Sequence, residues 1–151
     1  MSHVLICGAA GYTNLGDDAI LWGMVTQLRA ALGDRPIKVA GGPHLPELAA
    51  PLGLTTVPYH ERAELARAIE EADLVALGGG GLLYDVGYHP SLTRLLAEPE
   101  DRQWLYELAR LAAAARAAGR PAMLYGIGGG PLVTEAARRA ARVVAEHVEV
   151  V

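Results

Sequence analysis

Three short apolar runs in this chain each lead directly into a glycine-rich segment, and this repeated pattern restricts the fold more than any other feature. The runs cover residues 4–7, 74–77 and 122–125, and the glycine-rich segments that follow cover residues 8–16, 78–81 and 126–130. Apolar runs of this length are typical of buried strands. Glycine is favoured where the backbone needs a positive φ or where another group approaches it closely. We therefore expect three strands, each ending at a loop that can receive a ligand.

The remaining apolar pattern places helices between these strands. Leu21, Val25, Leu28 and Leu32 form a helical stripe that Gly33 closes. Two more strands are expected over residues 37–40 and 55–59, further helices over residues 46–52, 61–71, 90–96, 101–118 and 134–145, and a final strand over 148–151. Alternating strands and helices predict a single α/β domain over residues 1–151, with a doubly wound, mostly parallel, Rossmann-like sheet in three α/β/α layers.

Composition excludes several functional classes. The net charge is −4 and the arginines are spread over several predicted helices, so no nucleic-acid surface is expected. No apolar run approaches the roughly 20 residues of a membrane span, and no signal peptide is recognisable, which favours a cytoplasmic protein. Cys7 is expected to be an inert core residue. The histidines do not occur at metal-ligand spacing, so we expect no metal site. We also expect no cofactor.

The first glycine-rich segment matches neither common nucleotide-binding motif. Ala10 replaces the second glycine of the dinucleotide fingerprint, and Asp17 and Asp18 stand where a P-loop needs lysine and a hydroxyl residue. Two interpretations of Asp17 remain open. It can be the N-cap of the following helix, or, together with Asn14, it can offer acceptors to a ligand rich in hydroxyl groups.

The other two glycine-rich segments also leave alternatives open. Residues 78–81 are expected to form either an anion-binding nest at a helix start or a tight turn after a strand. Asp85 lies close by and the next cation is Arg94, so a neutral polyol fits this loop better than a phosphate. Residues 126–130 form either a third ligand loop or a plain turn before the helix that follows Pro131. His89 is a further candidate beside the tetraglycine segment.

Taken together, the segments at residues 11–21, 73–85 and 119–132 resemble the polysaccharide pyruvyl transferase family. The similarity spans nearly the whole chain and corresponds to the N-terminal half of a two-domain, glycosyltransferase-B-like enzyme. Such enzymes transfer the enolpyruvyl group of phosphoenolpyruvate to two hydroxyls of a sugar, commonly an N-acetylmannosamine in a cell-wall polysaccharide precursor. The product is a cyclic ketal.

The resemblance implies that this chain holds the acceptor, a sugar or lipid-linked saccharide. Phosphoenolpyruvate would bind mainly to a C-terminal domain that this chain lacks, so the chain alone is expected to be inactive. The final strand would contact that second domain or a second copy of the chain. The implied catalytic residues are Asp85 and Asp17, and the implied acceptor-binding residues are Tyr12, Asn14, Gly16, Gly79, Gly80, His89, Tyr125 and Gly128.

Two other functions compete with this one. A non-catalytic Rossmann-like module could bind a small ligand or dock on another chain, and the acceptor domain of a glycosyltransferase could work with a nucleotide-sugar donor. A second α/β half rich in arginine and histidine would favour the pyruvyl transferase. Binding of a uridine nucleotide by the completed protein would favour the glycosyltransferase.

Overall fold

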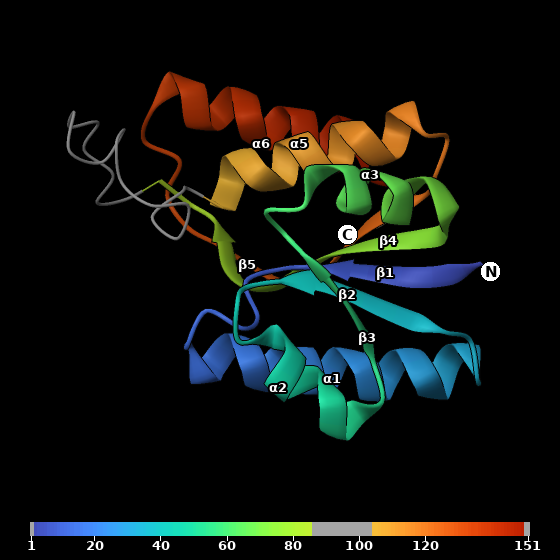
Figure 1. Cartoon of the computed structure of the whole chain (residues 1–151). Helices are drawn as coiled ribbons and strands as arrows, with labels where there is room; N and C mark the ends of the chain where they lie inside the picture. Colours follow the sequence, from blue (N-terminus) through green and yellow to red (C-terminus); the bar gives the residue numbers. More distant parts are fainter. Residues whose placement is uncertain (1, 86–103, 150–151) are drawn as a thin grey trace.

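The computed structural model describes residues 2–85 and 104–149 of the 151-residue chain. Five parallel strands form one sheet in the order β3-β2-β1-β4-β5, so β1 lies at its centre (Figure 1). The strands are β1 (His3–Cys7), β2 (Ile37–Gly41), β3 (Thr55–Pro58), β4 (Ala72–Leu83) and β5 (Ala122–Gly129). The predicted α/β, Rossmann-like fold is therefore confirmed.

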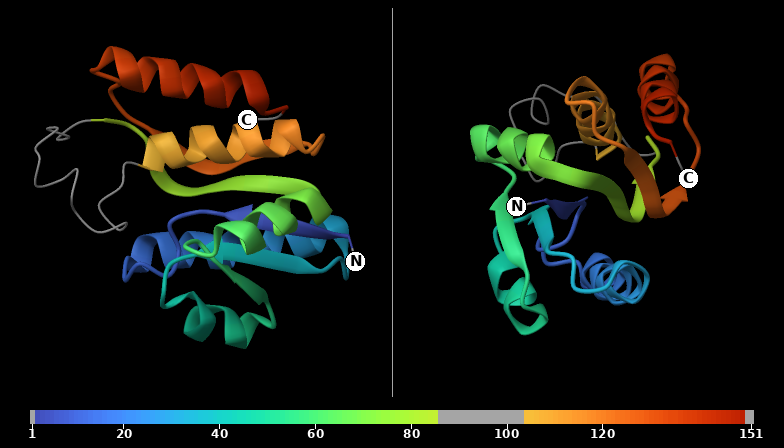
Figure 2. Two further views of the ribbon diagram at one scale, coloured as in Figure 1. Left: turned by 45° about the horizontal axis from the view of Figure 1, so that its top comes forward. Right: turned by 90° about the vertical axis from the view of Figure 1, so that its right-hand side faces the viewer.

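Helices cover both faces of the sheet, as Figures 1 and 2 show. Alternate residues of β1 point to opposite faces: Val4 and Ile6 pack against α1, whereas Leu5 and Cys7 pack against the helices of the other face. The helices are α1 (Leu15–Leu32), α2 (Leu45–Ala49), a 3-10 turn η1 (Ala50–Leu52), α3 (Arg62–Glu71), α5 (Trp104–Ala117) and α6 (Glu135–His147). The molecule thus has three layers, with α1 and α2 below the sheet in Figure 1 and α3, α5 and α6 above it.

Local signals in the sequence set most helix ends. Gly33 ends α1 with φ 67° and donates its N–H to the Arg29 carbonyl, as the apolar stripe before it predicts. Thr134 begins α6 by accepting a hydrogen bond from Ala137 N at 3.1 Å. Within the described residues, the helices predicted over 46–52, 61–71, 101–118 and 134–145 are present, with shifts of a few residues at their ends. The helix predicted from the stripe at residues 21–32 is also present, and it begins earlier, at Leu15.

The glycine-rich segments after β4 and β5 differ from the predicted loops. Residues 78–81 lie inside β4, and β5 continues to Gly129, because the two strands stay paired through their glycines. A Cβ atom on Gly78 would overlap the carbonyl oxygen of Tyr125, so side chains here would force the strands apart. The prediction of an anion-binding nest at a helix start is therefore wrong for residues 78–81.

The end of the described chain also departs from the prediction. Val148 and Glu149 belong to no strand, although Glu149 N donates a 2.8 Å hydrogen bond to the carbonyl of Ala122 at the free edge of β5. Residues 150–151 and the helix predicted over 90–96 lie outside the described residues. Cys7 is fully buried, and burial raises the pKa of its thiol to about 12, which fits the predicted inert core residue. No helix among the described residues is both long and apolar enough to cross a bilayer.

Candidate functional site

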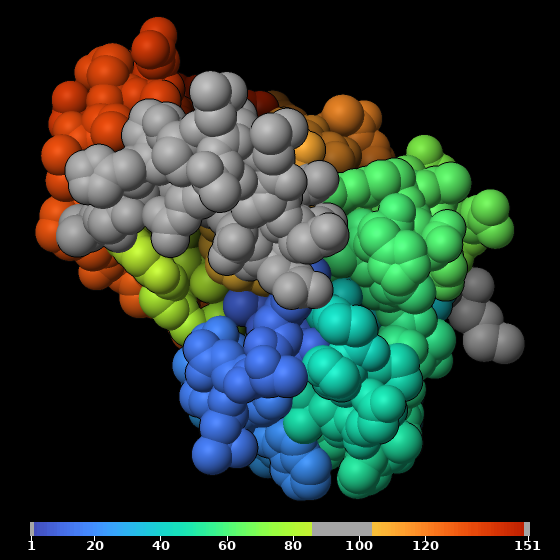
Figure 3. All heavy atoms as spheres, turned by 60° about the vertical axis from the view of Figure 1, so that its left-hand side comes forward, coloured from blue at the N-terminus to red at the C-terminus, as the bar shows by residue number. Residues whose placement is uncertain are grey.

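The centre of the sheet brings the first two glycine-rich segments together. β1 pairs with β2 on one side and with β4 on the other, so the strand order reverses at β1. In open α/β sheets, ligands bind at the carboxyl edge next to such a reversal. Figure 3 views this edge: the blue loop after β1 lies beside the yellow-green end of β4 and the cyan segment after β2. The start of α1 and the glycines of β4 therefore share one site.

The first turn of α1 is fixed by Asn14 and not by Asp17. The Asn14 side-chain oxygen accepts a hydrogen bond from Gly16 N at 3.0 Å, and its carbonyl accepts one from Asp18 N at 3.0 Å. Asn14 is thus the N-cap, which corrects the N-cap interpretation of Asp17. Gly16, an expected acceptor-binding residue, contributes its N–H to this cap and lies exposed in the first turn.

Asp18 secures the loop that leads into α1. Its Oδ1 accepts a hydrogen bond from Gly11 N at 2.9 Å. Gly11 has φ 81°, and Thr13 has φ 63°, a value that residues with a side chain rarely adopt. The carboxylate of Asp18 therefore holds a strained loop in one conformation, and it is not available as a free acceptor to a ligand through this oxygen.

Asp17 points from α1 toward the glycines of β4. A Cβ atom on Gly80, whose φ is 104°, would overlap the Asp17 carboxylate, so the two residues are in close contact. Within the described part of the chain, Asp17 makes no hydrogen bond or ion pair. Partial burial raises the pKa of Asp17 above its ordinary value, and the neighbouring charge of Asp18 raises it further. An unpaired carboxylate with a raised pKa accepts a proton more readily than an ordinary carboxylate does.

A small cavity opens beside Asp17, between α1 and the sheet. Its volume is about 10 Å³, which has room for about one water- or methyl-sized group. Gly79 lies in its wall with φ 97° and has no side chain to fill it. The cavity also touches Ile6, Gly8, Ala10, Leu21, Met24, Val39 and Gly78. A whole sugar ring cannot enter this space, so a saccharide would have to lie above it.

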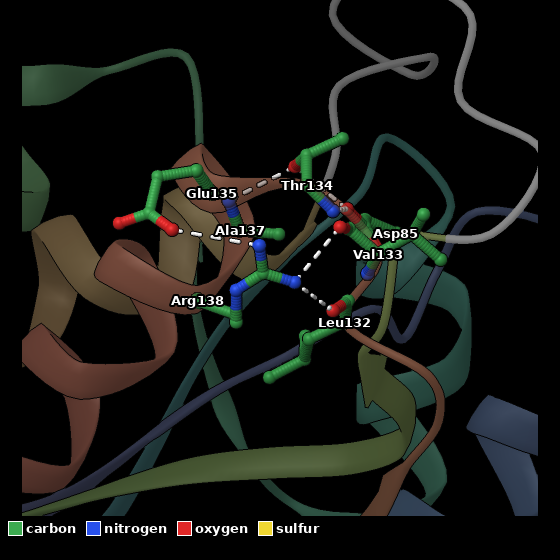
Figure 4. A network of polar contacts seen from close by, with 7 residues as sticks. All are labelled: Asp85, Leu132, Val133, Thr134, Glu135, Ala137 and Arg138. Carbon is green, nitrogen blue, oxygen red and sulfur yellow. Dashed lines mark hydrogen bonds and ion pairs between the residues drawn. The ribbon is translucent and has the colours of Figure 1, made fainter.

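The structure gives Asp85 a different environment from the one predicted. Figure 4 shows its carboxylate at the start of α6, where Oδ1 accepts from Val133 N at 2.5 Å and Oδ2 accepts from Thr134 N and Oγ1, both at 2.7 Å. Asp85 is buried. Burial opposes its charge, but the hydrogen bonds from Val133 and Thr134 outweigh that effect and lower the pKa of Asp85. These bonds make Asp85 a clamp between β4 and α6, and its catalytic role stays a prediction.

Arg138 completes this clamp from the next turn of α6. Its guanidinium donates to the carbonyls of Leu132 and Val133 at 3.0 and 2.9 Å, and it lies 3.4 Å from a carboxylate oxygen of Glu135 (Figure 4). The segment between β5 and α6 is therefore held from both sides. Arg138 serves this segment and is not a free cation for a phosphate.

Two expected acceptor residues of β5 have structural partners. The Tyr125 hydroxyl donates to the side-chain oxygen of Gln27 on α1, and Gly128 pairs with Gly81 of β4. Gly128 lies near the carboxyl end of β5, an edge strand of the sheet, whereas the Tyr125 hydroxyl reaches Gln27, ten residues beyond Asp17 on α1. His89 lies outside the described residues.

Sequence reasoning missed a cluster of aromatic and charged side chains, which lies on the opposite face of the sheet. The ring of Trp104 meets the rings of Tyr12 and Tyr59 edge-on, both at centroid distances of 5.6 Å. One turn along α5, the buried carboxylate of Glu107 pairs with Arg62 at 2.7 Å and also with Arg110. The helix predicted over residues 101–118 includes position 107, but nothing local indicated that two arginines would meet this glutamate there.

Within this cluster, the carboxylate of Glu107 neutralises the positive charges of Arg62 and Arg110. Burial opposes the charge of Glu107, yet hydrogen bonds from Arg62 and Arg110 outweigh it and lower the pKa of Glu107. Arg62 starts α3 directly after β3, so a cation does occur at the carboxyl edge. Its pairing with Glu107 makes it a poor phosphate ligand. Among the described residues, no cluster of three or more metal-binding side chains occurs.

Comparison with known proteins identifies the family of this chain. The family model described as polysaccharide pyruvyl transferase matches residues 14–151. One similar solved structure is described as the "Crystal structure of GtfA/B complex", with a TM-score of 0.44 and 9% sequence identity over 97% of this chain and 33% of that one. This chain thus spans about a third of the length of that protein, and no curated protein matches. The match over residues 14–151 includes α1 with Asp17, the tetraglycine segment of β4 and all of β5, and it places this chain in the polysaccharide pyruvyl transferase family.

Proposed function

We propose that this chain holds the saccharide acceptor in a pyruvyl transferase reaction, with phosphoenolpyruvate as the donor and a cell-wall polysaccharide sugar as the acceptor. The observation that carries the proposal is the Asp17 carboxylate. It lies where the strand order reverses, it has no hydrogen-bond partner within residues 2–85 and 104–149, and its pKa is raised. These are the properties of a general base for a hydroxyl group.

The reaction requires this base at a defined step. The oxygen of an acceptor hydroxyl bonds to C2 of the enolpyruvyl group, and its proton passes to Asp17 while an acid protonates the methylene carbon. The oxygen of a second acceptor hydroxyl then bonds to the same carbon while the bond from that carbon to the phosphate oxygen breaks. Inorganic phosphate leaves with the proton of this second hydroxyl, which closes the cyclic ketal. A base that gains a proton works best when its pKa is raised toward the working pH. Burial of Asp17 has this effect.

The surrounding residues suit a neutral, hydroxyl-rich ligand. Asn14 and Gly16 begin α1 on the exposed side of Asp17, and Tyr12 lies on the loop before them. Gly79 and Gly80 present backbone without side chains on the other side, next to Tyr125 and Gly128 of β5. We assign acceptor contacts to these residues. Asp85 would act through the loop that it fixes and would not touch the sugar.

The donor is assigned to a second domain. Phosphate and carboxylate groups need cations, but among the described residues around the site Arg62 and Arg110 are paired with Glu107, and Arg138 is paired with carbonyls and Glu135. We therefore expect the 151-residue chain to bind acceptor sugar without catalysing transfer.

An NMR titration of the 151-residue chain tests this assignment. N-acetylmannosamine should shift the amide signals of Asn14, Gly16 and Gly80, whereas phosphoenolpyruvate should not. Asp17→Asn should weaken sugar binding, and Asp34→Asn, an exposed carboxylate at the far end of α1, should leave it unchanged. If the sugar shifts no signal at this edge, the acceptor role is wrong and a docking module becomes the better description.

A further inference from the structure

The side of α1 that faces away from the sheet, downward in Figure 1, is apolar although it is exposed. Leu15 and Trp22 on this side are 83% and 43% exposed. Exposed positions recur there at helical spacing, and together they form what we call the outer face of α1: Leu15, Ala19, Trp22, Gly23, Thr26 and Ala30. None of these side chains carries a charge. The helix is therefore apolar both toward the sheet and away from it.

Another helix of the same protein has an ordinary exposed face. The exposed positions of α6 include Glu135, Arg138, Arg139, Arg142 and Glu146. Charged residues are usual where a helix surface meets water, whereas a helix that is apolar all round is normally covered all round. Clustered apolar side chains on a surface mark an interaction site. The outer face of α1 is thus expected to contact a partner.

Nothing in the described chain requires a glycine at position 23. Gly23 lies in the interior of α1 without a positive φ. Among the described residues, no atom beyond its own helix turns lies within 4 Å of where its Cβ atom would be. Glycine lowers the stability of a helix relative to alanine, but it lets another group approach the backbone closely. With the large ring of Trp22 next to it, the outer face offers both a projecting side chain and a gap that can receive one.

We infer that two copies of this chain associate through the outer faces of their α1 helices, antiparallel about a two-fold axis. An axis between Trp22 and Gly23 places Trp22 of each copy over Gly23 of the other. One turn farther along the contact, Ala19 of one copy lies opposite Thr26 of the other. Each pair combines a larger with a smaller side chain, so the face is complementary to itself, as a symmetric dimer requires. This inference does not depend on the proposed acceptor role.

Charge favours the antiparallel direction. Leu15 of one copy then lies opposite Ala30 of the other, so the last turn of each α1 meets the first turn of its counterpart. The exposed Arg29 approaches Asp18, and opposite ends of the two helix dipoles lie side by side. Among the described residues, Arg29 donates only through Nη2, to the Leu52 carbonyl at 2.6 Å, so its other N–H groups can serve the second copy. A parallel pair would instead bring the two acidic first turns together.

Sedimentation equilibrium of the 151-residue chain, from micromolar to millimolar concentration, should show a concentration-dependent dimer. Trp22→Ala should raise its dissociation constant by at least about tenfold, because a tryptophan seated at the centre of an interface carries much of the binding energy. Gly23→Glu should abolish the dimer, since it fills the gap with a charge. Ala31→Glu is the matched control: it adds the same charge at an exposed position of α1 outside the outer face and should leave the dissociation constant unchanged.

Unfolding in urea keeps the loss of the dimer distinct from a loss of folding. At micromolar concentration, Gly23→Glu should be at least as stable as the parent chain, because glutamate favours a helix more than glycine does and the space around Gly23 is open. A dimer that persists in Gly23→Glu would overturn the inference. A chain that stays monomeric at millimolar concentration would overturn it as well.

Cysteine cross-linking tests the direction of the two helices. Ala19→Cys and Thr26→Cys are prepared as separate variants and mixed under oxidising conditions. The mixture should yield a disulfide-linked dimer, whereas neither variant alone should, and the native Cys7 does not compete because it is fully buried. A disulfide formed by Ala19→Cys with itself would mean that the helices are not antiparallel about this axis.

Discussion

Single alanine substitutions in the tetraglycine segment of β4 should separate backbone strain from the contact with Asp17. Gly79 and Gly80 have similar positive φ values of 97° and 104°, but only at Gly80 would a Cβ atom overlap the Asp17 carboxylate. At Gly79 the nearest atom is the Ile20 Cγ2, at an ordinary 3.5 Å. Gly81 has no positive φ, and its nearest neighbour is Tyr84 Cε1 at 3.8 Å.

The expected losses of stability follow from these differences. An alanine held at such a φ costs about 1–3 kcal/mol, so Gly79→Ala should lose about that much. Gly80→Ala should lose the same amount plus about 0.5–1.5 kcal/mol, the cost of turning Asp17 out of its preferred side-chain conformation. Gly81→Ala should change the free energy of unfolding by less than about 1 kcal/mol, since its backbone tolerates alanine and the unfolded chain becomes less flexible.

A double-mutant cycle isolates the contact. Urea unfolding is measured for Gly80→Ala, Asp17→Ala and the combined variant, and for the same set with Gly79→Ala. The extra cost of Gly80→Ala should disappear when Asp17 is replaced, whereas the cost of Gly79→Ala should not change. If Gly81→Ala destabilises the protein as strongly as Gly80→Ala, or if Gly80 and Asp17 show no coupling, the described geometry of the site is wrong.

Three further predictions concern the carboxylates. The folded-state pKa of Asp85 is lowered, so the stabilisation from its hydrogen bonds is fully present above the ordinary carboxyl pKa and is lost as the pH falls through the folded value. In Asp85→Asn, the free energy of unfolding should no longer show this decrease at acid pH. The folded-state pKa of Asp17 is raised, so the fold loses stability as the pH rises through that value and the carboxylate ionises. Asp17→Asn should therefore stabilise the protein at neutral pH, and destabilisation there would contradict the unpaired carboxylate. Glu107→Gln should lower the free energy of unfolding in urea by about 1–2 kcal/mol. This is less than for a fully buried ion pair, because the side chains of Arg62 and Arg110 are 48% and 59% exposed. A loss above about 4 kcal/mol would mean that the arginines cannot return to water.

Local patterns predicted most of the fold. The apolar runs at residues 4–7, 37–40 and 55–59 match β1, β2 and β3 closely, and the stripe of α1 ends at Gly33 as expected. These patterns succeed because strand alternation and helix caps depend on residues near one another in sequence. The same reasoning failed at residues 78–81, where pairing with β5, more than 40 positions away, decides that glycines extend a strand.

In the candidate site, too, local sequence indicated the candidate residues, whereas long-range packing decided what each one contacts. The sequence indicates Asn14, Asp17 and Asp18 as candidate site residues, but it does not indicate which contact each of them makes. Asp18 turns back to Gly11, whereas Asp17 faces Gly80, and only the packing of α1 against β4 distinguishes them. The place of Asp85 shortly after the glycines makes it a candidate in the sequence. Its partners, Val133 and Thr134, are brought to it by the return of the chain through β5.

The glycines of β4 also affect the thermodynamics of binding at this edge. When a ligand settles on a surface of long side chains, each side chain that becomes fixed loses conformational entropy, at a cost of about 0.5–1.5 kcal/mol. Glycine has no side-chain entropy to lose, and the backbone at residues 78–81 is already held in the sheet by its pairing with β5. A ligand resting there meets a surface that is ordered before it arrives. Even a weakly interacting neutral ligand could then retain most of the free energy of its contacts.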